Sequence, residues 1–175
     1  MVKNFSAEGF TTNLKLRIPE KEEVIKGKEG KLYANRRDNR SLNFSMVAYD
    51  IVERLEVNKS QKVLEVACGA GQIAHYLYAF TKSKKITATD GSKELINAAK
   101  IRYKKEPIKF HVENIHKHSG KGKNDLVIIK DSFHHFKNTT KGMKELLDLL
   151  SSNGTLYIYA EWFKKRFPCR NLAGA

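Results

Sequence analysis

The sequence predicts an α/β fold with a doubly wound, mostly parallel sheet. Five short apolar runs, rich in β-branched residues, alternate with stretches whose apolar residues recur every three or four positions. This alternation is typical of units in which a helix connects two parallel strands. The first run, residues 63–67, leads into a glycine turn at 68–71, which places a helix N-terminus at the end of a strand.

The composition indicates one domain. The chain has 175 residues, of which 41% are hydrophobic, so it can bury a sizeable core. No apolar run approaches the ~18 residues of a membrane span, and residues 1–20 lack the apolar segment of a secretory signal. Cys68 and Cys169 lie far apart, without metal-ligand spacing. We therefore expect a reduced, cytoplasmic protein with no metal site.

The net charge of +14 is unevenly distributed. Residues 1–60 hold 12 basic and 9 acidic side chains, whereas residues 61–175 hold 21 and 10. Such a field favours anionic partners, and nucleic acid is one of them. The plainer interpretation is that the lysines solvate the surface, because no basic motif interleaved with aromatic residues is present.

The elements follow in order. The N-terminal arm, residues 1–41, is polar, and its segment 21–30 predicts a solvated, mobile arm or a short helix. The main domain is expected over 42–162 and a basic tail over 163–175. The first helix of the domain begins after Ser41, a suitable N-cap, because the apolar residues from Phe44 to Leu55 have helical spacing.

Strands and helices then alternate. Apolar or alternating residues predict strands over 63–67, 86–89, 108–112, 125–130 and 155–160. Amphipathic stretches predict helices over 72–82, after the cap Ser92, and over 139–150. Asn153 and Gly154 predict a turn before the last strand.

Polar residues at the ends of these strands indicate a ligand site. Glu65 is an acid inside an apolar strand, where its charge needs a partner; it would repel a pyrophosphate and attract a cation. Gly69 and Gly71 have no Cβ, so the backbone can approach a ligand closely. Asp90 lies 21 residues after Gly69 at a strand end, where a carboxylate can accept both hydroxyls of a ribose. Asn114, after the third strand, has an amide that can pair with an adenine edge.

One alternative is a dinucleotide site. Gly69, Gly71 and Ala74 satisfy the fingerprint of NAD-binding turns, although this pattern alone has low specificity. The acid at Glu65 and the lack of a second module for a nicotinamide half count against it.

The ordered series resembles the class I S-adenosylmethionine-dependent methyltransferases, of the small-molecule type related to ubiquinone and sterol methyltransferases. Its pieces are VLEVACGAGQIA at 63–74, ITATDGS at 86–92, HVEN at 111–114, DLVIIKDSFHHF at 125–136 and MKELLDLLSSNGTLYIY at 143–159. The resemblance covers about residues 44–160 and implies a Rossmann-like fold. It also implies S-adenosylmethionine as cofactor, S-adenosylhomocysteine as product, and in-line methyl transfer to a small-molecule acceptor.

The resemblance implies roles for particular residues. The implied cofactor-binding residues are Glu65, Ala67, Gly69, Gly71, Asp90, Gly91, Ser92, Asn114, Ile115 and Lys130, the last through its backbone. His134 and His135 are the candidates for a catalytic base, since histidine titrates near neutral pH; alternatively, the pair packs and hydrogen-bonds locally. Tyr33, Arg36 and Arg37 could close over the cofactor from the arm, or simply lie on the surface.

Several departures from the family pattern bear on function. Ala67 replaces the usual first glycine, and Glu65 and Asn114 stand where aspartate is more usual. The family fold continues into two further strands, but only 15 residues follow Ala160. We therefore expect a sheet truncated after the fifth strand, with that edge open or covered by a second copy or a partner chain. An RNA or protein methyltransferase, and a non-catalytic cofactor-binding subunit, remain the alternatives to a small-molecule enzyme.

Overall fold

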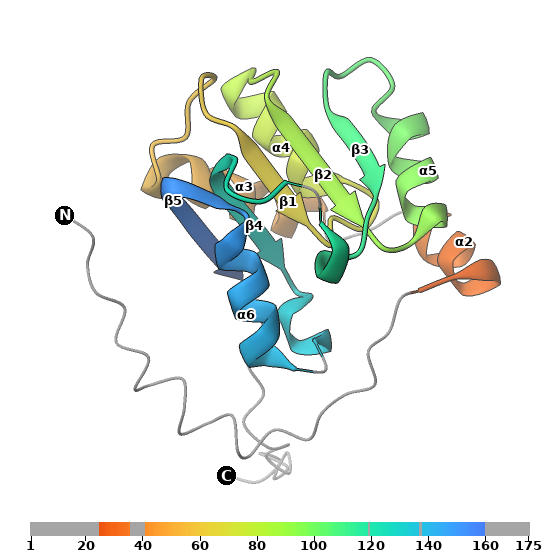
Figure 1. Ribbon diagram of the computed structural model, residues 1–175. Helices are drawn as coiled ribbons and strands as arrows, with labels where there is room; N and C mark the ends of the chain where they lie inside the picture. Colours follow the sequence, from red (N-terminus) through yellow and green to blue (C-terminus); the bar gives the residue numbers. More distant parts are fainter. Residues whose placement is uncertain (1–24, 36–40, 119, 137, 160–175) are drawn as a thin grey trace, which may run out of the picture.

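The fold was analysed in a computed structural model, which describes residues 25–35, 41–118, 120–136 and 138–159. The elements are α2 (Gly27–Asn35), α3 (Ser41–Arg54), β1 (Val63–Val66), α4 (Gln72–Thr81), β2 (Ile86–Asp90), α5 (Lys93–Arg102), β3 (Lys109–Val112), the 3₁₀ turn η1 (Ile115–Lys117), β4 (Asn124–Lys130), the 3₁₀ turn η2 (Phe133–His135), α6 (Thr139–Asp148) and β5 (Leu150–Tyr159). The alternation of strands and helices is as the sequence predicted (Figure 1).

The strands form one sheet in the order β3-β2-β1-β4-β5, and every pairing is parallel. The predicted doubly wound α/β fold is therefore confirmed. The chain runs outward from β1 to β3 and then crosses to β4 on the other side of β1. The carboxyl ends of β1 and β4 thus meet at a topological switch point, where open parallel sheets bind ligands.

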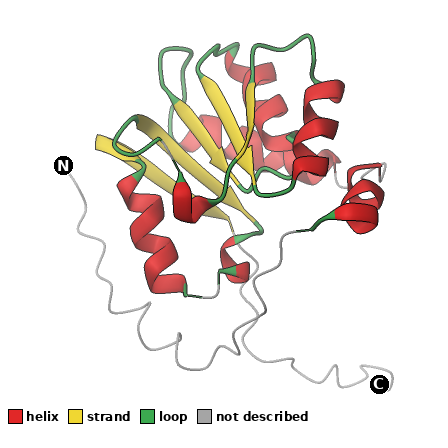
Figure 2. Ribbon diagram, turned by 45° about the vertical axis from the view of Figure 1, so that its right-hand side comes forward, coloured by secondary structure: helices red, strands yellow, loops and turns green. Residues whose placement is uncertain are grey.

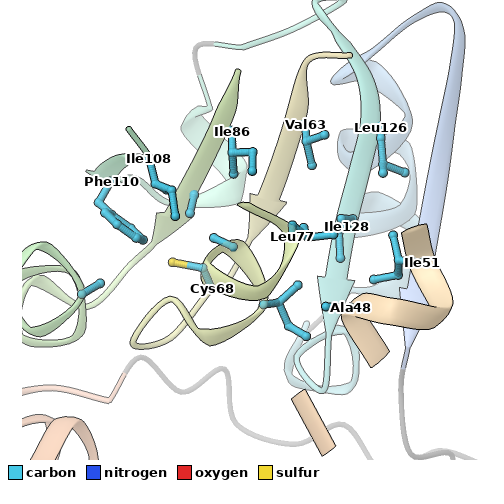
Figure 3. Packing of buried hydrophobic residues seen from close by; sticks show 14 of the residues in the cluster. Ala48, Ile51, Val63, Cys68, Leu77, Ile86, Ile108, Phe110, Leu126 and Ile128 are labelled. Carbon is cyan, nitrogen blue, oxygen red and sulfur yellow. The ribbon is translucent and has the colours of Figure 1, made fainter. Parts of the chain in front are cut away.

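Helices cover both faces of the sheet (Figure 2). One buried cluster joins alternate strand residues to α3, α4 and α5; Val63, Ile86, Leu126 and Ile128 lie there beside Ile51 and Leu77 (Figure 3). The other cluster joins the intervening strand residues to η2 and α6, and its members are Leu64, Val66, Val127, Ile129, Phe133, Phe136, Leu146 and Leu149. Burial on both faces explains why β1 and β4 read as continuous apolar runs.

Local signals in the sequence mark some boundaries correctly. The Ser92 hydroxyl accepts a hydrogen bond from the Leu95 amide, so the predicted cap of α5 is confirmed. Ser41 is the first residue of α3 instead of the residue before it. The predicted turn at Asn153 and Gly154 is wrong, because β5 continues through both residues.

The last strand has an irregular register that accounts for this error. Asn124 pairs with Leu150 and Leu126 with Thr155, so β5 bulges between these two pairs. A Cβ on Gly154 would lie 2.7 Å from the Asn124 carbonyl oxygen, so only glycine fits here. Gly154, which predicted a turn in the sequence, therefore allows the backbone of β5 to approach β4 closely at the bulge.

The segment preceding the domain forms a helix that rests on α5. The Gly27 amide donates to Glu94 Oε1 at 3.0 Å, and the Arg102 guanidinium donates to the Ala34 carbonyl at 3.0 Å. The predicted domain boundaries stay predictions, as does a partner at β5, which is an edge strand of the described sheet. None of the described helices has the length and apolar character needed to cross a membrane.

Candidate active site

A cavity of about 240 Å³ lies at the carboxyl ends of β1, β2 and β4. Nine of the twelve site residues predicted from the sequence line it: Glu65, Ala67, Gly69, Asp90, Gly91, Asn114, Ile115, Lys130 and His135. The other three, Gly71, Ser92 and His134, are not among the lining residues. The fold thus gathers residues from most of the chain at its switch point.

Glu65 is the buried acid of this cavity. Its residue is 3% exposed, and its Oε2 accepts a hydrogen bond from the Ala74 amide at 2.9 Å, in the first turn of α4. Burial raises the pKa of Glu65 to about 8, although the Ala74 hydrogen bond lowers it, and the nearby Asp90 charge raises it further. Near pH 7 this carboxyl group is therefore mostly protonated, and a cation beside it would favour its ionised form.

The turn after β1 has three residues with positive φ. Ala67 has φ 54°, Gly69 has φ 56° and Gly71 has φ 82°. A left-handed conformation favours glycine, so Ala67 is strained where the family usually has glycine. Strain of this kind is common at ligand sites, and Ala67 lines the cavity.

The two glycines have different roles. A Cβ on Gly69 would meet nothing within 4 Å, so its backbone faces open space at the cavity. A Cβ on Gly71 would lie 2.7 Å from the Phe110 ring, so Gly71 allows α4 to pack closely on the core. Gly71 thus packs against the core at the start of α4 and is not among the lining residues.

Asp90 holds the turn in place. Its Oδ2 accepts from the Gly69 amide at 2.9 Å, and its Oδ1 accepts from the Ser92 amide at 2.8 Å. Burial raises the pKa of Asp90, although these two amide hydrogen bonds lower it. Each carboxylate oxygen can accept a second hydrogen bond, so both remain able to receive hydroxyl groups. Ser92 itself is fully buried as the cap of α5.

Asn114 is partly committed to local structure. Its Oδ1 accepts from the His116 amide at 2.9 Å and caps η1. The amide NH₂ is the part of the side chain that this bond leaves for a ligand. Asn114 and Ile115 therefore bring a donor and an apolar side chain to the cavity wall.

Lys130, for which the sequence analysis predicts a role through the backbone, lines the cavity and also has a buried side chain. Its residue is 7% exposed. Its ammonium contacts the Asp131 carboxylate and lies 4.6 Å from the centre of the Phe44 ring and 5.2 Å from that of Tyr159. Its carbonyl oxygen accepts a hydrogen bond from the Ser132 hydroxyl at 3.1 Å.

The two candidate bases are neighbours with different surroundings. The His134 and His135 rings have centroids 4.0 Å apart, at the turn between β4 and α6. His135 lines the cavity, and His134 is not among the lining residues. Tyr33 of α2 also lines the cavity, whereas Arg36 and Arg37 lie outside the described residues.

Three of the other four histidines lie beside acidic side chains. His75 Nδ1 lies 2.7 Å from Glu106 Oε1. His116 Nδ1 lies 2.6 Å from Glu145 Oε2, and His118 Nε2 lies 3.0 Å from Glu113 Oε2. Within the described residues, no group of three or more histidine, cysteine or acidic side chains is arranged to hold a metal ion.

Sequence reasoning missed Phe44 as a lining residue, and it included Asp131 only as part of the segment 125–136. Phe44 fits the helical pattern of α3 and was counted only as a core position. Asp131 stands directly after β4, at one of the strand ends where the sequence indicates a ligand site. It has φ 51°, and its buried Oδ1 has no hydrogen-bond partner among the described residues.

Comparison with known proteins defines the class of the chain. Residues 57–173 match the family described as a methyltransferase domain, and the chain belongs to this family. A Bacillus cereus malonyl-[acyl-carrier protein] O-methyltransferase is 28% identical over 104 residues, which is 59% of this chain and 39% of that protein. The chain thus spans about two fifths of the length of this curated relative.

Solved structures share the fold. A proposed S-adenosyl-L-methionine-dependent methyltransferase of Methanococcus maripaludis has a TM-score of 0.69 and 18% identity, covering 81% of this chain and 67% of that one. The plantazolicin methyltransferase BpumL, solved with S-adenosylhomocysteine (SAH), has a TM-score of 0.58 and 24% identity, covering 73% of this chain and 49% of that one. The predicted resemblance and its cofactor class, S-adenosylmethionine, are confirmed.

Proposed function

We propose that this chain transfers a methyl group from S-adenosylmethionine to a small-molecule acceptor. The proposal depends above all on one observation, the buried acid Glu65 beside Asp90 at the switch point of a methyltransferase-family sheet. An acid held in its neutral form by burial suits a ligand whose charge is positive.

The residues of the cavity fit this cofactor. Its ammonium and sulfonium are cationic, and Glu65 gains a favourable partner when it ionises beside them. Asp90 offers two carboxylate oxygens at the end of β2 for the ribose hydroxyls. Gly69 leaves room for close approach to the backbone, and Asn114 with Ile115 suits the adenine.

The cofactor supplies a methyl group on a good leaving group, so the protein mainly has to bind, orient and exclude water. Glu65 and Lys130, which are both buried, would lie at the part of the cavity from which a bound cofactor excludes water. His135, which lines the cavity, would accept the proton of an oxygen or nitrogen acceptor. His134 lies against His135 and would act through it.

The names of the relatives support a small or carrier-bound acceptor. The B. cereus protein is named for a malonyl group on acyl-carrier protein, and BpumL for plantazolicin. The high positive charge of this chain also favours an acceptor with anionic groups.

Calorimetric titration with S-adenosylmethionine and SAH tests the proposal. Asp90→Ala should weaken binding by about 30-fold or more, since it removes two carboxylate acceptors. Asp148→Ala is the matched control, because Asp148 is an exposed acid at the end of α6 that does not line the cavity. A folded wild-type chain that binds neither ligand at millimolar concentration would refute the function, and an unchanged Asp90→Ala affinity would refute the ribose assignment.

A further inference from the structure

The buried lysine Lys130 is among the residues that line a cavity proposed for a cationic ligand. The side chain of Lys130 is 5% exposed, and Phe44 of α3, Tyr159 of β5 and Asp131 surround its ammonium. A lysine at this position would repel a sulfonium and an ammonium unless an anionic group came between them. The Asp131 carboxylate is one such group.

Lys130 and Glu65 project from the same face of the sheet. Glu65 pairs in register with Ile128, and Lys130 follows Ile128 by two residues on β4. Alternate residues of a strand point to the same side, so both side chains lie on the α3 and α4 face, at the carboxyl ends of adjacent strands. The Lys130 charge lowers the pKa of Glu65, as expected of neighbours within one cavity.

The ammonium of Lys130 has capacity for a further ligand. It carries three N–H donors, and the Asp131 carboxylate is its one oxygen partner among the described residues. The aromatic rings of Phe44 and Tyr159 can stabilise the charge through their faces, but they accept no conventional hydrogen bond. A second carboxylate would therefore complete the surroundings of this lysine.

S-adenosylmethionine contains a single carboxylate, at its amino-acid end, next to its ammonium. We propose that Lys130 binds this carboxylate while Glu65 faces the ammonium, so that the two side chains recognise the zwitterionic end of the cofactor. This inference rests on the proposed function. It makes Lys130 a specificity-determining residue that rejects ligands lacking the carboxylate.

The inference is tested by comparing the binding of S-adenosylmethionine with that of decarboxylated S-adenosylmethionine, which lacks only the carboxylate. Calorimetry on the wild-type chain should give about 10- to 100-fold tighter binding of the complete cofactor, the usual value of a charge-assisted hydrogen bond at a buried site. In Lys130→Met this ratio should fall to about threefold or less, with the affinity for the decarboxylated ligand nearly unchanged.

Lys82→Met is the matched control. The Lys82 ammonium also lies over an aromatic ring, 5.5 Å from the centre of Tyr78, but Lys82 is exposed and does not line the cavity. This variant should keep the wild-type ratio. Lys130→Arg retains the charge and should keep most of the difference in affinity between the two ligands. If Lys130→Met does not fold, loss of this difference in Lys130→Arg would contradict the inference.

The outcomes separate the inference from the function on which it rests. If the wild-type chain binds both ligands equally well, or Lys130→Met keeps the full ratio, Lys130 does not recognise the carboxylate and the inference is wrong while the function stands. Unchanged cofactor binding with a raised KM for the acceptor would assign Lys130 to the acceptor and also overturn the inference. If the wild-type chain binds neither ligand, the function and the inference fail together.

Discussion

At pH 8, replacing Glu65 with glutamine should raise stability and weaken ligand binding. Glutamine has nearly the same shape and keeps an oxygen that can accept the Ala74 amide hydrogen bond. It has no charge at any pH. The variant therefore removes the cost of keeping a buried carboxyl group protonated above pH 4.5, and it also removes the group proposed to face the cofactor cation.

The magnitude follows from the pKa of Glu65, which rises from the ordinary 4.5 to about 8 on burial. Because the folded state prefers the protonated form, the contribution of Glu65 to the free energy of unfolding is fully present below pH 4.5. It is lost as pH rises toward 8. The loss is about 4 kcal/mol at pH 8 and less than about 1 kcal/mol at pH 5.

The Glu65→Gln variant should lack this dependence. Its free energy of unfolding relative to wild type should rise by about 3–4 kcal/mol between pH 5 and pH 8. The buried NH₂ of the new amide subtracts about 1–3 kcal/mol at both pH values and leaves the difference intact. Urea unfolding at the two pH values measures it. A difference below about 1 kcal/mol would show that Glu65 is not held in its neutral form.

Ligand binding provides the second measurement. At pH 7 a carboxyl group with a pKa of about 8 is protonated in about 0.9 of the molecules. If a cationic ligand ionises Glu65, binding releases about 0.9 protons, and wild-type affinity rises about tenfold from pH 6 to pH 7. Calorimetry in buffers of different ionisation enthalpy counts these protons. Glu65→Gln should bind more weakly and release none; equal proton release by both proteins would refute the reasoning.

Two further predictions concern the glycine turn and the histidine pair. Gly71→Ala should destabilise the fold by about 2–4 kcal/mol in urea unfolding, because its Cβ meets Phe110 at 2.7 Å and its φ is 82°. Gly69→Ala, with open space at its Cβ, should cost only about 1 kcal/mol, and equal losses would contradict the assigned roles. With an acceptor found by a radiolabelled-methyl screen, His135→Asn should lower kcat about 100-fold at unchanged SAH affinity. His134→Asn should lower kcat less. A larger loss of kcat in His134→Asn than in His135→Asn would show that His135 is not the base, although it lines the cavity.

The strands and their order along the chain were predictable, because burial on both faces of a sheet produces a simple apolar pattern in the sequence. β1 and β4 are nearly continuous apolar runs, and a parallel sheet covered by helices requires such runs. The bulge in β5 was not predictable, because Asn153 and Gly154 have the same residue types in a turn and in a bulge. Only the pairing of this segment with β4 distinguishes the two.

For the candidate site, too, some features were predictable from the sequence and others were not. The sequence by itself predicted that Glu65, Asp90 and Asn114 lie within, at and just after the carboxyl-terminal parts of three parallel strands. Chain connectivity and strand direction bring these strand ends to one edge of the sheet. The sequence also determined that an acid inside an apolar strand must find a partner.

Only the tertiary structure decided which side chains face the cavity. Gly71 turns toward Phe110 while Gly69 faces open space, and the ammonium of Lys130 lies between Phe44 and Tyr159. These contacts join segments far apart in the chain, so no local pattern encodes them. The sequence predicted polar groups at the carboxyl edge of the sheet, and packing between distant elements determines which of them line the cavity.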